Sequence, residues 1–208
     1  MAHTVENKTA ENKSEHAKVD LSDLVMQSGE YRLFENRVIF ISEGINAAVA
    51  KRVVSNLLAM EAAKAGAPIT VYLNSPGGEV NSGYSIFDTI RFISSPVNIV
   101  ASGLCASIAT VIFVATDKNR RYSMPNTKFL IHQPLIPGQI YGQASDIEIT
   151  AKEILKTRQK INELLSKECK QPLEKVAKDT TRDYWMSASE ALEYGLVTKI
   201  IENIKELK

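Results

Sequence analysis

Two residues with catalytic potential lie in the apolar part of the chain, a serine at position 107 and a histidine at position 132. Ser107 stands in a run of small residues at positions 103–109, and His132 directly follows a short apolar run. The two other histidines, His3 and His16, lie in the polar beginning of the chain. Because a serine hydroxyl becomes nucleophilic when a neighbouring base takes its proton, the pair predicts a hydrolase with a serine nucleophile.

A histidine base needs an acid that fixes its tautomer, and two aspartates near the C-terminal end could supply it. They are Asp179 and Asp183, and spacing alone does not choose between them. A helix that starts at Ser107 would add unpaired backbone N–H groups, whose partial positive charge stabilises an oxyanion. The pattern Gly-x-Ser-x-Gly is absent from the sequence, so the α/β-hydrolase family is not indicated.

Each of these features also has a structural explanation. The small residues around Ser107 would let a helix pack closely on a sheet, and a lone histidine at a strand end is often structural. The sequence Asn-Ser-Pro-Gly-Gly at positions 74–78 is typical of a tight turn. In an active site, the same adjacent glycines would let a substrate or an oxyanion approach the backbone. The residue types alone leave both explanations open.

Alternating strands and helices are expected to position these residues. Continuous β-branched and aromatic runs predict strands, and apolar residues at helical spacing predict helices. Three successive strand–helix units imply right-handed crossovers and a largely parallel sheet, whose sites gather at the carboxyl ends of its strands. We expect strands at 38–41, 69–73, 97–100, 128–132 and 196–201, and helices at 46–65, from about 82 until Pro96, and at 106–115, 144–170, 173–180 and 187–194.

The predicted strand ends bring the chemistry-bearing segments together. The turn at 74–78, the turn at 102–107 and His132 each follow a strand, so they are expected to converge at one edge of the sheet. Gly103 is expected to form a turn between the third strand and the helix that carries Ser107. Asp183 is expected to lie in a connector just before Trp185.

The composition argues against function on nucleic acid or on a membrane. The chain has 208 residues, 44% of them hydrophobic, and its 25 Lys and Arg against 24 Asp and Glu give a net charge of +1. No overall field would therefore gather nucleic acid or an anionic membrane surface. Two distant cysteines without CxxC spacing favour free thiols in a reducing, cytoplasmic compartment and argue against a metal site built on them.

The start of the chain differs in composition from the rest. Residues 1–28 are polar and lack clear periodicity, so we expect a mobile arm before a single domain at 29–208. No secretory signal or transit peptide is recognisable, and the longest apolar region is shorter than the roughly 18 residues that a membrane span usually needs.

Four motifs in order resemble one known family, the proteolytic subunit of the Clp protease. The resemblance extends from about Val38 to Ile201, nearly the whole expected domain. The motifs are Asn74-Ser75-Pro76-Gly77-Gly78, Gly103-x-x-Ala106-Ser107, Met124-Pro125-Asn126-x4-Ile131-His132-Gln133-Pro134, and Thr181-Arg182-Asp183-x3-Ser187-Ala188-x-Glu190-Ala191-x-Glu193-Tyr194-Gly195-Leu196-Val197.

The resemblance implies a crotonase-like α/β fold of the ClpP type, with a repeated ββα/βαβ core and a projecting handle helix at 144–170. It also implies a serine peptidase site without a metal. By this resemblance, the catalytic residues are Ser107, His132 and Asp183; the oxyanion hole is formed by Gly78 and Ile108; the substrate-binding residues are Gly78, Glu79, Val80, Pro134 and Leu135; and Gln133 and Arg182 couple the ring interface to the site.

The resemblance further implies a homo-oligomer of two stacked heptameric rings that cleaves unfolded polypeptides inside a chamber. An AAA+ Clp ATPase chaperone would feed this chamber and use ATP, while this chain would bind no cofactor itself. Pairing with a second, non-identical ClpP-type subunit is another expectation. Two alternatives remain open: a ring subunit of low intrinsic activity that works with such a partner, and a crotonase-type acyl-thioester enzyme.

Overall fold

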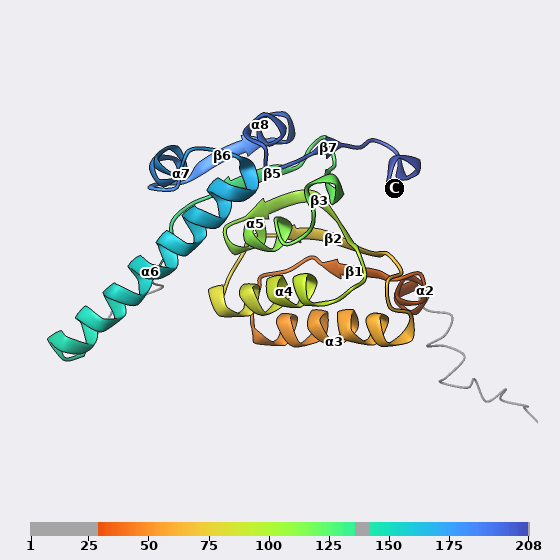
Figure 1. The fold of residues 1–208 in the computed structure, drawn as a ribbon, viewed down its shortest axis with the longest axis horizontal. Helices are drawn as coiled ribbons and strands as arrows, with labels where there is room; N and C mark the ends of the chain where they lie inside the picture. The colour runs from red at the N-terminus through yellow and green to blue at the C-terminus, as the bar shows by residue number, and fades with distance from the viewer. Residues whose placement is uncertain (1–28, 136–141, 208) are drawn as a thin grey trace, which may run out of the picture.

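A sheet of seven strands forms the centre of the protein (Figure 1). The computed structural model describes residues 29–135 and 142–207. The strand order is β1-β2-β3-β4-β7, and β5 pairs with both β3 and β6. All pairings are parallel except that of β5 with β6. The strands are β1 Val38–Ile41, β2 Ile69–Ser75, β3 Val97–Ala106, β4 Arg121–Ser123, β5 Lys128–Ile131, β6 Tyr184–Ser187 and β7 Lys199–Ile200.

The helices lie on two sides of the sheet, and one of them projects. In Figure 1, α7 and α8 lie near β6, on the other side of the sheet from α3 and α4. In Figure 1, α3 and α4 lie side by side along the sheet, whereas α6 runs outward from the body of the molecule. The expected mobile arm at 1–28 lies outside the described residues. The described helices are α2 Gly29–Glu35, α3 Ala47–Ala63, α4 Val80–Phe92, α5 Ile108–Phe113, α6 Ala144–Cys169, α7 Leu173–Asp179 and α8 Ala188–Tyr194, with short 3-10 helices at Lys118–Arg120 and Ile204–Glu206.

Local sequence signals explain where several elements begin and end. Asn46 caps α3 by accepting a hydrogen bond from the Val49 backbone N–H at 3.0 Å. A capping box starts α8, with Ser187 and Glu190 bonded to each other's backbone N–H. Gly195 ends α8 at a φ of +85°, as expected of a C-terminal glycine. The helices predicted at 46–65 and 187–194 are confirmed, with ends that differ by at most two residues.

The third strand is longer than predicted and does not end in a turn at Gly103. β3 continues to Ala106, and Gly103 bends it at a φ of +70°. The pairing with β2 shifts there, because Leu73 pairs with Ala101 but Ser75 pairs with Cys105. The first part of β3 therefore pairs with β4 and its last part with β5, so one strand carries two branches of the sheet.

Two features of the C-terminal end differ from the expected elements. Asp183 lies in a connector as predicted, but the residues that follow it form a strand that was not predicted, β6, which pairs antiparallel with β5. The last strand covers only Lys199–Ile200, because the backbone N–H groups of Leu196 and Val197 donate to the Ala191 carbonyl and not to a neighbouring strand. Which of these residues form strands depends on pairing partners far along the chain. Local periodicity carries no information on such partners.

The core lies between the sheet and the helices α3, α4 and α5. Its members include fully buried side chains of each layer, so burial of apolar area fixes the helices on the sheet. Within the described residues, no helix is both long enough and apolar enough to cross a membrane. Representative core residues are Val53, Leu57, Ile86, Ile99 and Ile112, each with no exposed surface.

Candidate active site

Ser107 sits at the junction between β3 and α5 in a conformation that L-residues rarely adopt. Its φ is +57° and its ψ is −128°. The chain holds this strain because the Ser107 N–H donates to the Leu130 carbonyl of β5 at 2.9 Å, while Ala106 is still paired in the sheet. The sharp turn separates the serine from its strand and lets α5 begin at the next residue, Ile108.

His132 and Asp183 face each other because β5 and β6 are antiparallel. The register pairs Ile131 with Tyr184, so the next residue of one strand lies opposite the preceding residue of the other. Nδ1 of His132 is 2.9 Å from Oδ1 of Asp183. The histidine side chain is 14% exposed and the aspartate side chain 61% exposed, so the acid stands at the rim of the site.

The other ring nitrogen of His132 faces the serine. Nε2 of His132 lies 2.9 Å from Oγ of Ser107. When the carboxylate accepts a hydrogen bond from the Nδ1–H group, Nε2 presents its lone pair to the serine hydroxyl, which donates to it. The structure thus joins the three side chains in one hydrogen-bonded chain that can move the serine proton to histidine.

The second candidate acid, Asp179, has different partners. Its Oδ2 accepts hydrogen bonds from Nζ of Lys175 at 2.6 Å and from the Tyr194 hydroxyl at 3.0 Å. Burial of the Tyr194 ring and its bond to Asp179 raise the pKa of that phenol. Asp179 therefore serves the packing of α7 against α8, and only Asp183 reaches the histidine.

The paired glycines form the opposite wall of the site. A side chain on Gly77 would put its Cβ 2.6 Å from Cβ of Ser107 and 2.7 Å from the Ala106 carbonyl oxygen. Gly77 and Gly78 have φ values of +91° and +150°. Only glycine permits this backbone to lie directly against the serine. Ile108, the first residue of α5, has no intrahelical acceptor for its N–H.

A groove beside these residues is large enough for an extended chain. Its volume is about 720 Å³. All five residues predicted to bind substrate line it together with Ser107 and His132; they are Gly78, Glu79, Val80, Pro134 and Leu135. The Glu79 carboxylate accepts a hydrogen bond from the Ser82 hydroxyl at 2.8 Å, so its side chain is held at the start of α4.

The residues predicted to couple the ring interface to the site have unlike surroundings. The backbone N–H of Gln133 donates to the Thr180 carbonyl at 2.7 Å, and its side-chain amide donates to the Thr181 carbonyl at 2.9 Å. Gln133 thereby fastens the segment after His132 to the segment before Asp183. Arg182 is exposed, directly before the acid.

A buried hydrogen bond that holds the segment before Asp183 was not predicted from the sequence. The Thr180 hydroxyl lies 2.9 Å from Oδ1 of Asn162, and both residues are at least 95% buried. Asn162 belongs to α6, so this helix helps to fix the position of Asp183. The signal for it was a polar residue between Ile161 and Leu165 on the buried face of the helix, where burial requires a partner.

Neither a metal cluster nor a reactive thiol is found in the part of the chain that the structure describes. Among residues 29–135 and 142–207, no three side chains of His, Cys, Asp or Glu are grouped closely enough to hold a metal ion. Cys105 and Cys169 are free and buried. Burial raises the pKa of both thiols, in the case of Cys169 to about 12, so neither is an activated nucleophile.

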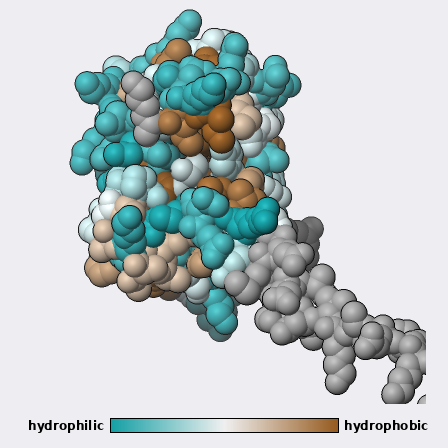
Figure 2. Space-filling view, turned by 90° about the vertical axis from the view of Figure 1, so that its right-hand side faces the viewer, coloured by the Kyte–Doolittle hydropathy of each residue, from teal (hydrophilic) through white to brown (hydrophobic). Residues whose placement is uncertain are grey.

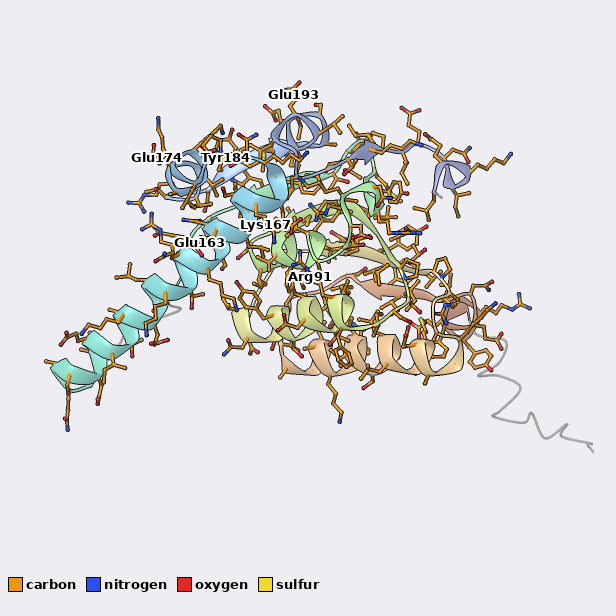
Figure 3. The ribbon with its side chains drawn as sticks, in the orientation of Figure 1. Arg91, Glu163, Lys167, Glu174, Tyr184 and Glu193 are labelled. Carbon is orange, nitrogen blue, oxygen red and sulfur yellow. The ribbon has the colours of Figure 1, made fainter. Side chains whose placement is uncertain are left out.

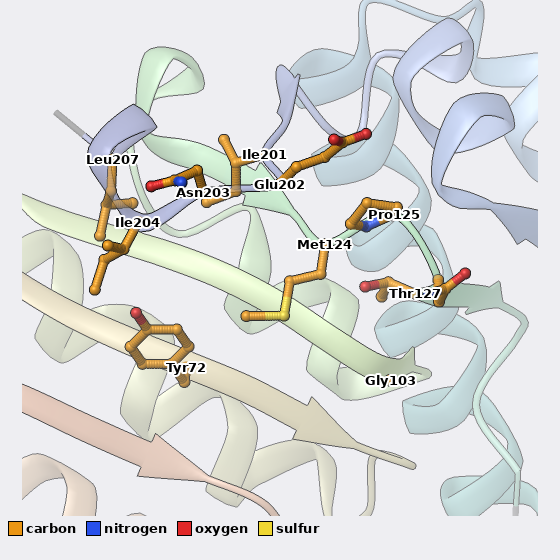
Figure 4. Close-up of a pocket in the computed structure, with 11 residues that line it drawn as sticks. Tyr72, Gly103, Met124, Pro125, Thr127, Ile201, Glu202, Asn203, Ile204 and Leu207 are labelled. Carbon is orange, nitrogen blue, oxygen red and sulfur yellow. The ribbon is translucent and has the colours of Figure 1, made fainter.

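A second hollow lies at the C-terminal end of the molecule, away from Ser107. Its volume is about 470 Å³, and its lining is largely apolar (Figure 4). Figure 2 shows apolar patches among hydrophilic side chains on this end of the molecule. The side chains that face this C-terminal hollow include Tyr72, Met124, Ile201, Ile204 and Leu207.

Comparison with known proteins assigns the chain to a family. The model of the Clp protease family matches residues 23–204. This chain belongs to the Clp protease family. The ClpP-like α/β fold and the resemblance expected from the sequence motifs are both confirmed.

Individual relatives agree with this assignment over most of their length. The chain is 46% identical over 205 residues to the ATP-dependent Clp protease proteolytic subunit 2 of Gluconobacter oxydans, covering 98% of this chain and 88% of the relative. It is 44% identical over 201 residues to the same-named subunit of Treponema denticola, covering 97% and 96%. A solved ClpP1 mutant from Listeria monocytogenes has a TM-score of 0.78 and 41% identity, covering 86% of this chain and 98% of that chain.

Proposed function

We propose that this chain is a serine endopeptidase, the proteolytic subunit of an ATP-dependent Clp protease. The observation that carries the proposal is the hydrogen-bonded chain from Ser107 through His132 to Asp183, with 2.9 Å at each contact. Crotonase-type acyl-thioester chemistry would not need these three side chains to be joined. A serine peptidase of the Ser-His-Asp type uses all of them together.

In the proposed mechanism, Oγ of Ser107 attacks the carbonyl carbon of the scissile bond while Nε2 of His132 takes the hydroxyl proton. Asp183 stabilises the imidazolium that forms. The backbone N–H groups of Gly78 and Ile108 bind the developing oxyanion, and the positive end of α5 assists them. His132 then gives its proton to the leaving amine, and water hydrolyses the acyl-enzyme in the reverse order of steps.

The proposed substrates are unfolded polypeptides. The groove borders the backbone of residues 78–80 on one side and Pro134 and Leu135 on the other. An extended peptide can pair with such backbone edges as an added strand, which folded proteins cannot offer without local unfolding. The mechanism requires no metal and no cofactor held by this chain.

We further propose the assembly that the family implies: two heptameric rings stacked through α6, fed by an AAA+ Clp ATPase that uses the ATP. Several relatives have names numbered as subunit 2 or 3, which supports pairing with a second ClpP-type subunit. The apolar C-terminal hollow with Tyr72, and the nearly bare side chain of Phe92 at 83% exposure, are suited to docking an apolar loop of the ATPase. Such a machine would work in the cytoplasm.

A fluorophosphonate probe tests the nucleophile directly. We expect covalent labelling of Ser107, complete loss of labelling in Ser107→Ala, and strongly slowed labelling in His132→Ala, because the hydroxyl then lacks its base. Ser85→Ala, which removes an exposed hydroxyl on α4, should label as the wild type does. Labelling that persists in Ser107→Ala, or an assembled ring that never labels, would contradict the proposal.

A further inference from the structure

A small pocket adjoins the reacting groups on the side facing α6. Ser107 and His132 both border it, as they border the open groove. Its free volume is about 20 Å³, against about 720 Å³ for the groove. The wall also contains Thr110, whose hydroxyl donates to the Ser107 carbonyl, and is otherwise apolar, with Pro134, Val80, Ile108, Val111, Ile131, Ile161 and Leu165.

The walls of this pocket belong to the packed core. Ile108, Val111, Ile131 and Leu165 are each at most 3% exposed, and Ile161 is 8% exposed. They come from α5, β5 and α6, three elements that the core holds together. Because packed interiors have little room to yield, the pocket cannot widen by a simple side-chain rotation.

The Ile108 side chain packs against Gly83 of α4, which has no side chain of its own. A Cβ on Gly83 would lie 2.2 Å from Cγ1 of Ile108, so the isoleucine already occupies the space that this glycine leaves. The side chain has therefore no further room toward α4. On the opposite side, Ile161 and Leu165 hold the pocket closed from α6.

We propose that this pocket selects the substrate residue whose carbonyl Ser107 attacks, and that it admits alanine or glycine but excludes leucine and larger side chains. This inference rests on the proposed peptidase function. The Cα of that residue is one bond from the attacked carbon, so its side chain can enter only a space that borders Ser107. A volume of about 20 Å³ accommodates roughly one water-sized group, which matches a methyl group.

Apolar lining adds a second criterion to size. A charged side chain would lose its hydration without a charged partner of fixed sign, since among the described residues His132 is the only ionisable one that borders the pocket. A small apolar side chain has no comparable favourable hydration to lose. The chemical class of substrate is therefore a polypeptide cut after small, uncharged residues.

Matched fluorogenic peptides that differ only at this residue test the inference on the full chain in its assembled form. We expect kcat/KM for the alanine peptide to exceed that for the leucine peptide by at least about tenfold, since a misfit of even one methylene costs about that much. Leu165→Ala should lower this ratio by about tenfold or more by opening the pocket. Leu58→Ala, an equal truncation of a 44% exposed residue on α3, should leave the ratio unchanged.

A milder variant covers the case in which Leu165→Ala does not fold. Ile161→Val removes one methylene group from the wall and should raise kcat/KM several-fold for a 2-aminobutyrate peptide relative to the alanine peptide. A wild-type protein that labels with fluorophosphonate at Ser107 but cleaves the leucine peptide as fast as the alanine peptide would overturn the inference alone. Absence of both labelling and cleavage would overturn the proposed function, and the inference with it.

Discussion

At the scale of single residues, the site depends on which of two aspartates meets the histidine. Asp179 ends α7 and Asp183 follows it four positions later in the chain. The antiparallel pairing of β6 with β5 turns Asp183 toward His132, whereas Asp179 is engaged by Lys175 and Tyr194. The choice of acid is thus a consequence of strand register.

Asp183→Asn is expected to lower kcat by about 10²–10⁴-fold, because an amide no longer fixes the productive tautomer or stabilises the imidazolium. Asp179→Asn is the matched control and should leave kcat within a few-fold of the wild type, since its partners lie outside the site. Steady-state kinetics on a peptide substrate measure both. Equal losses in the two variants would contradict the assignment of the acid.

Gly77→Ala is expected to lower kcat by at least about a hundredfold, because the new methyl group would push the serine out of position. The added Cβ would lie 2.6 Å from Cβ of Ser107. Gly66→Ala is the control. Gly66 has a φ of +76°, but a Cβ placed there would meet no atom within 4 Å. Only backbone strain is therefore expected, which should lower the unfolding free energy by about 1 kcal/mol. Steady-state kinetics measure both variants, and full activity of Gly77→Ala would refute the close approach.

At the scale of elements, an ion-pair cluster fastens the inner end of α6 to the core. Glu168 accepts hydrogen bonds from Arg91 at 2.8 Å and from the buried Arg121 at 2.5 Å, which joins α6 to α4 and β4. Figure 3 labels Arg91 of this cluster, on α4. Burial alone would raise the pKa of Glu168, but the bonds and charges of Arg121 and Arg91 outweigh it and hold that pKa below the ordinary 4.5.

This cluster predicts an acid-sensitive stability. Because the folded state lowers the pKa of Glu168, its contribution is fully present above pH 4.5 and is lost as pH falls through the lower folded value. Glu168→Gln should make the unfolding free energy less dependent on pH in this range. It should also lower the unfolding free energy at neutral pH by about 3 kcal/mol, because Arg121 stays buried without its counter-charge. Denaturant unfolding between about pH 3 and pH 7, a range chosen to bracket the ordinary carboxyl pKa, measures it.

Glu163→Gln on the exposed face of α6 provides the control for that experiment. Glu163 accepts a hydrogen bond from the side chain of Gln159 at 2.8 Å and bonds to no buried arginine among the described residues. Its substitution should change stability by no more than about 0.5 kcal/mol at any pH. If the unfolding free energy of Glu168→Gln depended on pH as that of the wild type does, the lowered pKa of Glu168 would be contradicted.

At the scale of the whole molecule, the outer part of α6 leaves apolar side chains uncovered. Ile149 and Leu155 are each 60% exposed along the helix that projects from the body (Figure 1). A projecting helix with uncovered apolar residues indicates contact with another subunit. This agrees with the proposed stacking of two rings through α6.

Ile149→Asp should therefore weaken ring stacking, because a carboxylate would lose its hydration in an apolar contact. Native mass spectrometry is expected to show a shift from the double ring to a species of half the mass. Lys152→Asp, at an already polar and 65% exposed position of the same helix, is the control and should keep the larger assembly. An unchanged mass for Ile149→Asp would argue against stacking through this face.

Signals between residues close in the chain were enough to predict several elements and the candidate chemistry. A continuous apolar run predicted β1, and apolar residues at helical spacing predicted α3. The motifs likewise sufficed for the family. The serine, the histidine and the glycine pair were recognised from their types and their places after predicted strands.

The arrangement of the site depends on contacts between segments that are distant in the sequence. The extension of β3 beyond Gly103, the strand β6 and the bond between Asn162 and Thr180 each depend on partners distant in the sequence. The positive φ of Ser107 likewise requires β5 to hold the neighbouring backbone. Local propensity carries no information on such pairings, because their free energy comes from burial and hydrogen bonds formed once the chain has folded.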